Sequence, residues 1–318
     1  MMYRTADPTL AAGRATGVTM LGDLLPNLDV IVTIVLRGTA VGALFAIVAM
    51  SFNIVHNAAG IFNFAQGSIF LLGAFGAFVL ADRAGFGLWL PMLVLVALAV
   101  GALTALQGWI TLLPLRSSVE QDSWLISTVA VSVIIAASLT LAFGSQGNMV
   151  QGPLPRYTII GVRTPGAFLL AIGAMFAWYV ALRWFLRRTF TGLAISALSQ
   201  DFDAARAAGI PVRRLQLLAF GVSGVVAGSV GFMVAPMISV SPDAGLRYVL
   251  NGFVAAVVGG IGNNTGTLIG GPLVGVIAAL TAFYVGGAYQ DLASLLVLVL
   301  ILMFLPQGLF GRAAARKV

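Results

Sequence analysis

Long apolar runs separated by short polar segments dominate the chain. Membrane-spanning helices need about 20 predominantly apolar residues, and most of these runs approach or exceed that length. The runs cover residues 28–54, 69–81, 88–113, 124–143, 166–186, 215–240, 248–261, 267–285 and 292–305. This pattern predicts an all-α polytopic integral membrane protein with about eight or nine membrane segments.

Two places in this pattern predict broken or re-entrant helices. Residues 53–68 read NIVHNAAGIFNFAQGS and place amides and one histidine at membrane depth, where such groups must face protein or water. The helix after this break begins between Ile61 and Ile69. Residues 248–261 are too few to span a bilayer and are followed by GNNTG. Residues 37–75 and 250–282 therefore share an order of small-residue run, break and small-residue run, which is often found beside transport pathways.

The longest hydrophilic segment between apolar runs covers residues 187–214. It reads RRTFTGLAISALSQDFDAARAAGIPVRR, and residues 193–208 contain neither glycine nor proline. Asp201 and Asp203 suit the start of a second helical piece, which Gly209 and Pro211 then end. A basic helical loop of this kind offers a surface that a cytosolic partner could grip. A solvated connection, held inside by its arginines, explains the same composition equally well.

Composition supports the membrane assignment. The chain is 60% hydrophobic and 8% charged, with a mean hydropathy of +1.03, whereas soluble domains carry about 25% charged residues. The net charge of +7 resides in short loops beside apolar runs, as the positive-inside rule predicts, which argues against nucleic-acid binding. With loop 187–214 in the cytosol, ten basic residues lie inside and six outside. Arg37 falls within the membrane, where we expect it to snorkel or face protein.

Several chemistries are excluded by the residues that the chain lacks. It has no cysteine and a single histidine, His56, so disulfides, thiolate metal sites and multi-histidine metal sites are ruled out. The ten acidic residues all fall in tails, loops or run ends, so the chain has no mid-membrane carboxylate for an ion-driven carrier. No catalytic constellation is recognisable. The chain is expected to be a translocation subunit energised elsewhere, and a self-sufficient secondary carrier or channel is the alternative.

The expected organisation is one membrane domain with short polar ends. Residues 1–27 are predicted to form a disordered polar tail, since they contain no apolar core of a cleaved signal peptide. Residues 28–311 form a single transmembrane permease domain, and residues 312–318 form a basic cytosolic tail.

Three blocks carry a family resemblance and occur in the expected order. They are GIFNFAQGSIFLLGAF at residues 60–75, DAARAAGIPVRRLQLLAFGVSGVVAGSVG at residues 203–231, and the segment 253–312 that closes on LPQGLFGR. Together they resemble branched-chain amino-acid ABC transporter permeases, the shorter of the two permease types. This family usually has His where Gln66 stands, Tyr where His56 stands, Arg where Leu305 stands, and a small or amide residue near Arg37.

The resemblance implies a non-enzymatic permease subunit in the bacterial inner membrane. It would form the path for branched-chain or related amino acids, with urea, short amides or another small polar solute as alternative cargo. The implied partners are a second, longer permease, two cytosolic ATPases that bind ATP-Mg, a periplasmic solute-binding protein and membrane lipid. No cofactor, metal or nucleic acid is expected on this chain itself.

The resemblance also assigns candidate site residues. The coupling role, in which a short cytosolic helix docks into an ATPase, falls on Asp203, Ala204, Ala205, Arg206, Gly209 and Arg213. Independently of the resemblance, the polar residues at membrane depth suggest a translocation path at Asn63, Phe64, Gln66 and Asn251. The alternatives are structural: Asn63 and Gln66 would cap a broken helix, Phe64 would pack, and Asn251, like Asn263 and Asn264, would satisfy the backbone at a break.

Overall fold

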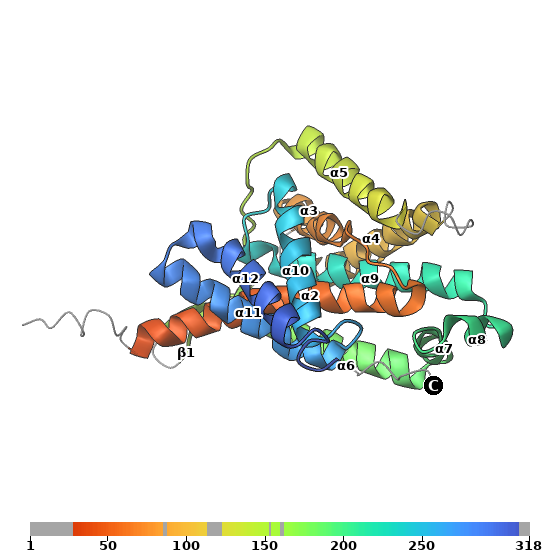
Figure 1. Ribbon diagram of the computed structural model, residues 1–318. Helices are drawn as coiled ribbons and strands as arrows, with labels where there is room; N and C mark the ends of the chain where they lie inside the picture. The colour runs from red at the N-terminus through yellow and green to blue at the C-terminus, as the bar shows by residue number, and fades with distance from the viewer. Residues whose placement is uncertain (1–27, 85–87, 113–122, 153, 160–161, 312–318) are drawn as a thin grey trace, which may run out of the picture.

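The chain folds as a bundle of long helices in a computed structural model that describes residues 28–84, 88–152, 154–159 and 162–311 apart from 113–122 (Figure 1). The helices are α2 (Leu28–Ala59), α3 (Gln66–Ala84), α4 (Trp89–Leu112), α5 (Ser123–Phe143), α6 (Gly166–Arg188), α7 (Phe190–Leu198), α8 (Phe202–Ala207), α9 (Val212–Val234), α10 (Gly245–Gly259), α11 (Asn264–Tyr284) and α12 (Gln290–Phe304). Within the described residues, seven helices are long and apolar enough to cross a membrane. The predicted all-α membrane fold is confirmed.

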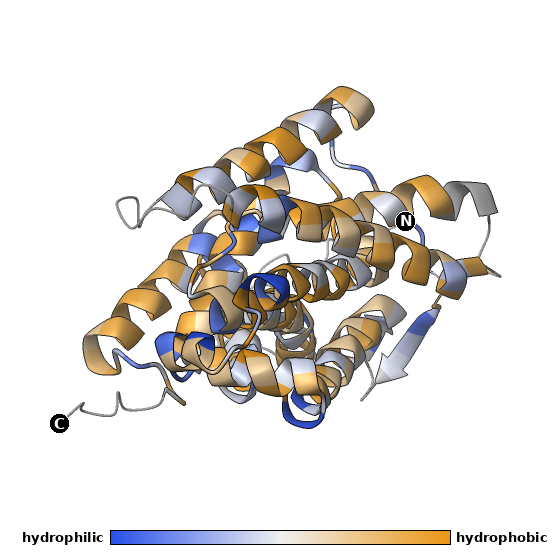
Figure 2. Cartoon of the chain, turned by 90° about the vertical axis from the view of Figure 1, so that its right-hand side faces the viewer, coloured by the Kyte–Doolittle hydropathy of each residue, from blue (hydrophilic) through white to orange (hydrophobic). Residues whose placement is uncertain are grey.

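Helix α2 lies at the centre and packs against α11, α9, α10 and α6. Its side chains from Ala43 to Val55 are fully or almost fully buried. By contrast, α5 and α12 bury few of their side chains and present leucine, isoleucine and valine outward. In Figure 2, orange hydrophobic residues cover much of the helices on the outside of the bundle. An outer surface of this kind is stable in lipid or against another apolar subunit, which agrees with the predicted membrane location.

Glycine faces allow the central helices to approach closely. At the α2–α11 crossing, a Cβ at Gly42 would lie 2.5 Å from the Gly271 carbonyl oxygen and the Pro272 Cα. In α9, Gly224 and Gly228 both face α4, and Gly228 also faces Gly73 of α3. In lipid such small-residue contacts are a main source of helix association.

Both predicted breaks are present. Gly60, with φ +70°, follows the end of α2, and α3 begins at Gln66, within the expected range from Ile61 to Ile69. The second break follows α10, where Gly260 and Gly262 have φ values of +98° and +78°. Helix α10 has 15 residues, and Figure 1 shows it crossing α2 and α11 steeply. These breaks position the candidate path residues.

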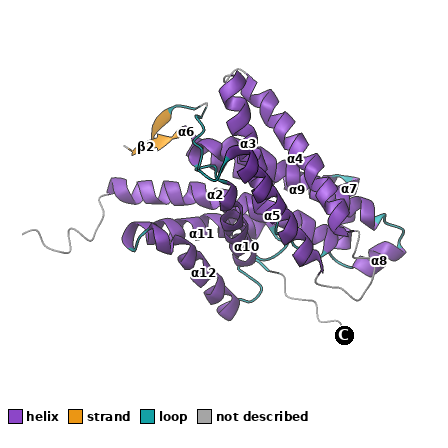
Figure 3. Ribbon diagram, turned by 90° about the horizontal axis from the view of Figure 1, so that it is seen from above, coloured by secondary structure: helices purple, strands orange, loops and turns teal. Residues whose placement is uncertain are grey.

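Several helices and strands begin or end at residues other than those predicted from the apolar runs. Between the apolar runs 124–143 and 166–186, the chain forms the antiparallel strands β1 (Arg156–Ile159) and β2 (Val162–Pro165), which the apolar pattern did not indicate. Helix α3 continues past the apolar run 69–81 to Ala84, and α10 begins at Gly245, three residues before the apolar run 248–261. Figure 3 shows the hairpin at an edge of the bundle, away from α7 and α8. The predicted tails, 1–27 and 312–318, lie outside the described residues.

Candidate coupling helix and translocation path

Helix α7 anchors the basic loop to the bundle. The Thr189 side chain caps it by accepting a hydrogen bond from the Gly192 backbone N–H at 3.0 Å. Ile195 and Leu198 are buried, and α7 packs against α6, α2 and α9. A force applied to this loop would therefore reach the ends of three membrane helices.

Helix α8 follows and has defined ends. Asp201 Oδ1 accepts a hydrogen bond from the Ala204 N–H at 3.0 Å, and Gly209, with φ +81°, donates to the Arg206 carbonyl at 3.1 Å. The predicted second helical piece and its glycine stop are thus confirmed. Residues 193–208 do not form one helix, however. The chain breaks at 199–201, where the Asp201 side chain competes for the backbone as an N-cap.

The predicted coupling residues lie together on α8 and just beyond it. Ala205 is buried and fixes the helix on the bundle, whereas Asp203, Ala204 and Arg206 are exposed. Beside them is a hollow of about 550 Å³, lined by residues that include Phe202, Arg206, Arg213 and Gln216. No ion pair involves Asp203, Arg206 or Arg213 within the described part of the chain. Their charges are therefore available to a partner, and their coupling role stays a prediction.

Asn63 and Gln66 lie side by side at the first break and are fully buried. Asn63 Nδ2 donates to Gln107 Oε1 at 3.0 Å, and Gln107 Nε2 donates back to Asn63 Oδ1 at 2.8 Å. Asn63 Oδ1 also accepts from the Ala65 N–H, and Gln66 Nε2 donates to the Ser223 carbonyl at 3.1 Å. These amides close the start of α3 in this conformation, and a role in the path is untested.

Gln107 was missed in the sequence, although a lone amide inside the apolar run 88–113 is a usable signal. It is 6% exposed and exchanges two side-chain hydrogen bonds with Asn63. A buried side-chain amide in lipid needs such a partner, and the partner came from a different run 44 residues away.

Phe64 belongs to a half-buried aromatic cluster. Its ring stacks on Trp124 at 6.3 Å between centroids and lies 6.1 Å from Phe253. The adjacent Phe62 stacks on His56 at 4.6 Å. The cluster joins the first break to the start of α5 and to α10, so the packing interpretation of Phe64 has geometric support.

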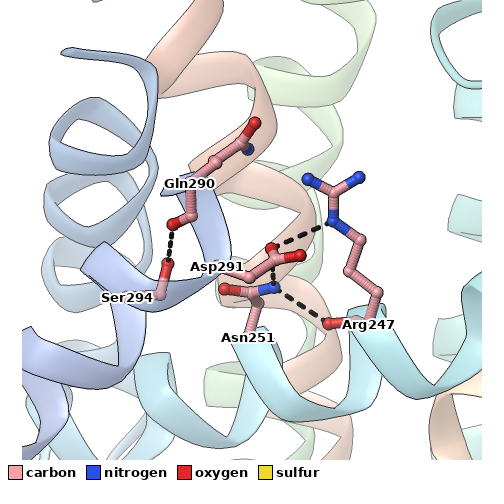
Figure 4. Close-up of polar contacts among 5 residues, drawn as sticks. All are labelled: Arg247, Asn251, Gln290, Asp291 and Ser294. Atoms are coloured by element: carbon pink, nitrogen blue, oxygen red, sulfur yellow. Dashed lines mark hydrogen bonds and ion pairs between the residues drawn. The ribbon is translucent and has the colours of Figure 1, made fainter. Parts of the chain in front are cut away.

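Asn251 lies elsewhere, on α10. It is 3% exposed, and its Nδ2 donates to the Arg247 carbonyl at 3.0 Å and to Asp291 Oδ1 at 3.2 Å. Arg247 Nε also donates to Asp291 Oδ1, at 3.0 Å (Figure 4). Sequence reasoning placed Arg247 in a loop and Asp291 at a run end, and it missed their pairing. Arg247 and Asn251 share a face at i and i+4, but nothing in the pattern indicated α12 as their partner.

A further amide network ties the second break to α2. Asn53 is fully buried, and its Oδ1 accepts from the Gly262 N–H at 2.9 Å. Its Nδ2 donates to Thr267 Oγ1 at 2.9 Å and to Asn264 Oδ1 at 3.1 Å. The structural role expected for Asn264 fits this arrangement, while Asn263 caps α11 through the Thr265 and Gly266 N–H groups.

Comparison with known proteins identifies the family. The sequence profile described as the permease component of branched-chain amino-acid transport systems matches residues 34–305. The chain belongs to this permease family. The LivH high-affinity branched-chain amino-acid permease of Salmonella typhimurium is 29% identical over 298 residues, covering 89% of this chain and 96% of the relative. The corresponding permease BraD of Pseudomonas aeruginosa is 27% identical over 296 residues, with the same coverage of both chains.

The family also includes permeases for other solutes. The ribose import permease RbsC of Haemophilus influenzae is 27% identical over 302 residues, covering 90% of this chain and 88% of the relative. Membership in this family identifies the chain as a permease subunit of an ABC importer in the inner membrane. Permeases of this class work with ATPase subunits and a solute-binding protein.

Proposed function

We propose that this chain is the translocation subunit of an importer for branched-chain amino acids, driven by ATP hydrolysis on partner subunits. The observation that carries the proposal is the family match across residues 34–305, joined to similarity with branched-chain permeases over 96% of their length. No observation favours urea or short amides as cargo. The chain itself would carry no catalytic group and no cofactor, with ATP-Mg on the ATPases.

The proposed assembly contains four kinds of partner. A second, longer permease would pair with this one in a heterodimer, and its apolar surface would cover part of the outward-facing α5 or α12. Two cytosolic ATPases would bind at the end of the bundle that carries α7 and α8. A periplasmic binding protein would deliver solute at the opposite end, and lipid would cover the remaining apolar faces.

The coupling proposal assigns the ATPase contact to α8. Its exposed face carries Asp203, Ala204 and Arg206, and the adjacent hollow carries Arg213. Because α7 is packed against α6, α2 and α9, displacement of α8 by a closing ATPase pair would move the ends of those helices. In this proposal Gly209 fixes the angle at which α8 is presented, through its positive φ.

Reconstitution tests the proposed function. The chain would be placed in proteoliposomes with the longer permease, the ATPases and the binding protein, and uptake of radiolabelled leucine, valine, urea and ribose would be measured with and without ATP. We expect ATP-dependent uptake of leucine and valine only. Uptake of equal rate without the ATPase subunits would indicate a self-sufficient carrier and contradict the proposal.

The coupling role is tested by Gly209→Ala. No atom lies within 4 Å of the added methyl group, so the substitution acts only through backbone strain of about 1–2 kcal/mol in the left-handed region. We expect leucine uptake per ATP hydrolysed to fall several-fold while the complex still assembles. Gly173→Ala in α6, which also has open space, is the matched control. Unchanged uptake per ATP in Gly209→Ala would remove the coupling role from this residue.

A further inference from the structure

The ion pair between Arg247 and Asp291 lies at a hollow that has no assigned role. The hollow measures about 290 Å³, which is near the lower limit of small-molecule sites. It is formed by the N-terminal parts of α10 and α12 and by the short helix Pro242–Ala244 that precedes α10. Its lining residues are Asp243, Leu246, Arg247, Leu250, Asn251, Val254, Asp291 and Leu295.

The ion pair leaves some hydrogen-bonding groups of both Arg247 and Asp291 free to bind a ligand. Arg247 donates through Nε, and Asp291 accepts from Arg247 and Asn251 through the same oxygen, Oδ1. Among the described residues, no hydrogen bond reaches the two terminal guanidinium nitrogens or Asp291 Oδ2. Figure 4 shows those terminal nitrogens directed away from Asp291. Both side chains are about half exposed, at 48% and 50%, so a ligand can reach them.

These free groups match the two charges of an amino acid. The terminal nitrogens of a guanidinium bind a carboxylate in bidentate geometry. The Oδ2 atom of Asp291 can accept a hydrogen bond from an ammonium group, and Asp243 adds a second acid on the same hollow. The apolar lining offers Leu246, Leu250, Val254 and Leu295 to a branched hydrocarbon side chain. Charge and apolar surface therefore coexist at one small site.

The position of the hollow agrees with a receiving role. The short helices that precede α10 and α12, at Pro242–Ala244 and Gly287–Tyr289, lie at loops on the end that carries the β-hairpin. Helix α10 then leads from the hollow to the break at Gly260, where Asn53 binds the Gly262 N–H. With α7 and α8 facing the ATPases, the hollow lies toward the side from which solute arrives.

We propose that this hollow is a subsite that receives a zwitterionic amino acid with a branched side chain. The Arg247 terminal nitrogens bind the α-carboxylate, Asp291 Oδ2 binds the α-ammonium, and the leucines contact the side chain. Asn251 is a positioning residue, because it holds Asp291 from a buried position on α10. The inference rests on the proposed function and names the site at which its cargo is first recognised.

The test uses the complete reconstituted transporter and leucine as the probe. Arg247→Gln and Asp291→Asn should each raise the KM for leucine tenfold or more. Arg156→Gln on the hairpin, an exposed arginine that removes the same charge, is the control and should leave KM unchanged. In the wild type, 4-methylpentanoate and 3-methylbutylamine, each lacking one charged group of leucine, should compete at least tenfold more weakly than leucine.

A labelling experiment provides a second test if the Arg247→Gln or Asp291→Asn variant fails to assemble. The chain has no cysteine, so Leu246→Cys, which replaces a side chain 63% exposed, introduces a unique thiol at the hollow. Leucine should slow its reaction with a maleimide several-fold, and ribose should not. Ser145→Cys in the exposed loop after α5 is the control, and leucine should not change the rate at which it reacts with the maleimide.

The outcomes separate the two proposals. If the wild type takes up leucine but neither KM nor Leu246→Cys labelling responds as stated, the subsite is overturned and the proposed function stands. Competition by 3-methylbutylamine equal to that of leucine would also overturn the subsite, because the carboxylate contact would then be absent. If the wild type takes up no leucine or valine, the proposed function itself fails.

Discussion

Single buried amides hold the two helix breaks together. Asn53 bonds the backbone of the second break, and Asn63 pairs with Gln107 at the first. Within the described residues, each of these amides satisfies groups that lipid cannot hydrate. Such residues look like path residues in a sequence, yet in this conformation their hydrogen-bonding groups are directed at protein. The same chemistry can thus serve a break and a pathway, and only contacts distinguish the two.

We predict that Asn53→Ala destabilises the protein by about 2 kcal/mol, because the Gly262 N–H and Thr267 Oγ1 lose a partner. The measurement is the thermal unfolding midpoint of the purified chain in detergent. Ser138→Ala is the control, since that hydroxyl is exposed and bonds only to the Ile134 carbonyl of its own helix. Equal midpoints for wild type and Asn53→Ala would contradict the role given to Asn53.

The helices of the bundle approach one another closely where they carry glycine, which has no side chain. The central helices α2, α3, α4, α9 and α11 meet along glycines, and the exposed helices α5 and α12 do not need them. A Cβ at Gly231 of α9 would fall on the Phe70 carbonyl oxygen of α3. Because that obstacle is backbone rather than a flexible side chain, the helices themselves would have to separate.

Gly231→Ala is therefore predicted to destabilise the α3–α9 packing by several kcal/mol, more than Asn53→Ala does. Gly173→Ala in α6 is the matched control, because no atom lies within 4 Å of its added methyl group. The two variants would be compared by detergent unfolding and by the fraction that remains monodisperse on size exclusion. A Gly231→Ala protein as stable as Gly173→Ala would contradict the described packing.

At the scale of the whole molecule, the ends of the bundle differ in chemistry. One end carries α7, α8 and the arginines of loop 187–214, and the other carries the β-hairpin and the loops before α10 and α12 (Figure 1). The positive-inside rule assigns the α7–α8 end to the cytosol. This polarity is what allows ATPase contact and solute arrival to occur on opposite sides.

Two serine-to-cysteine variants of the cysteine-free chain test this polarity. Ser145 follows α5 near the hairpin end, Ser199 lies between α7 and α8, and both are exposed. A membrane-impermeant maleimide should label Ser145→Cys in intact spheroplasts and Ser199→Cys only in inside-out vesicles. The reverse pattern would place α8 outside and exclude ATPase contact there.

The membrane class, the positions of both breaks and the capped helix before Gly209 could be predicted from the sequence alone. These features follow from local properties: apolar run length, amide content, and the conformational freedom of glycine. The sequence also pointed to the family through three ordered blocks. The hairpin at 156–165 was missed, because two strands of four residues carry too short an alternation to be distinguished from a loop.

The contacts between polar groups became known only from the folded chain. Arg247 and Asp291 are 44 residues apart, as are Asn63 and Gln107, and Asn53 and Gly262 are separated by 209. Each pairing depends on how whole helices cross, which in lipid is set by the fit of their glycine faces. Periodicity places a residue on a face of its own helix and leaves the opposing helix undetermined. For that reason the sequence did not show that Arg247 and Asp291, the two charged residues of the proposed subsite, contact each other.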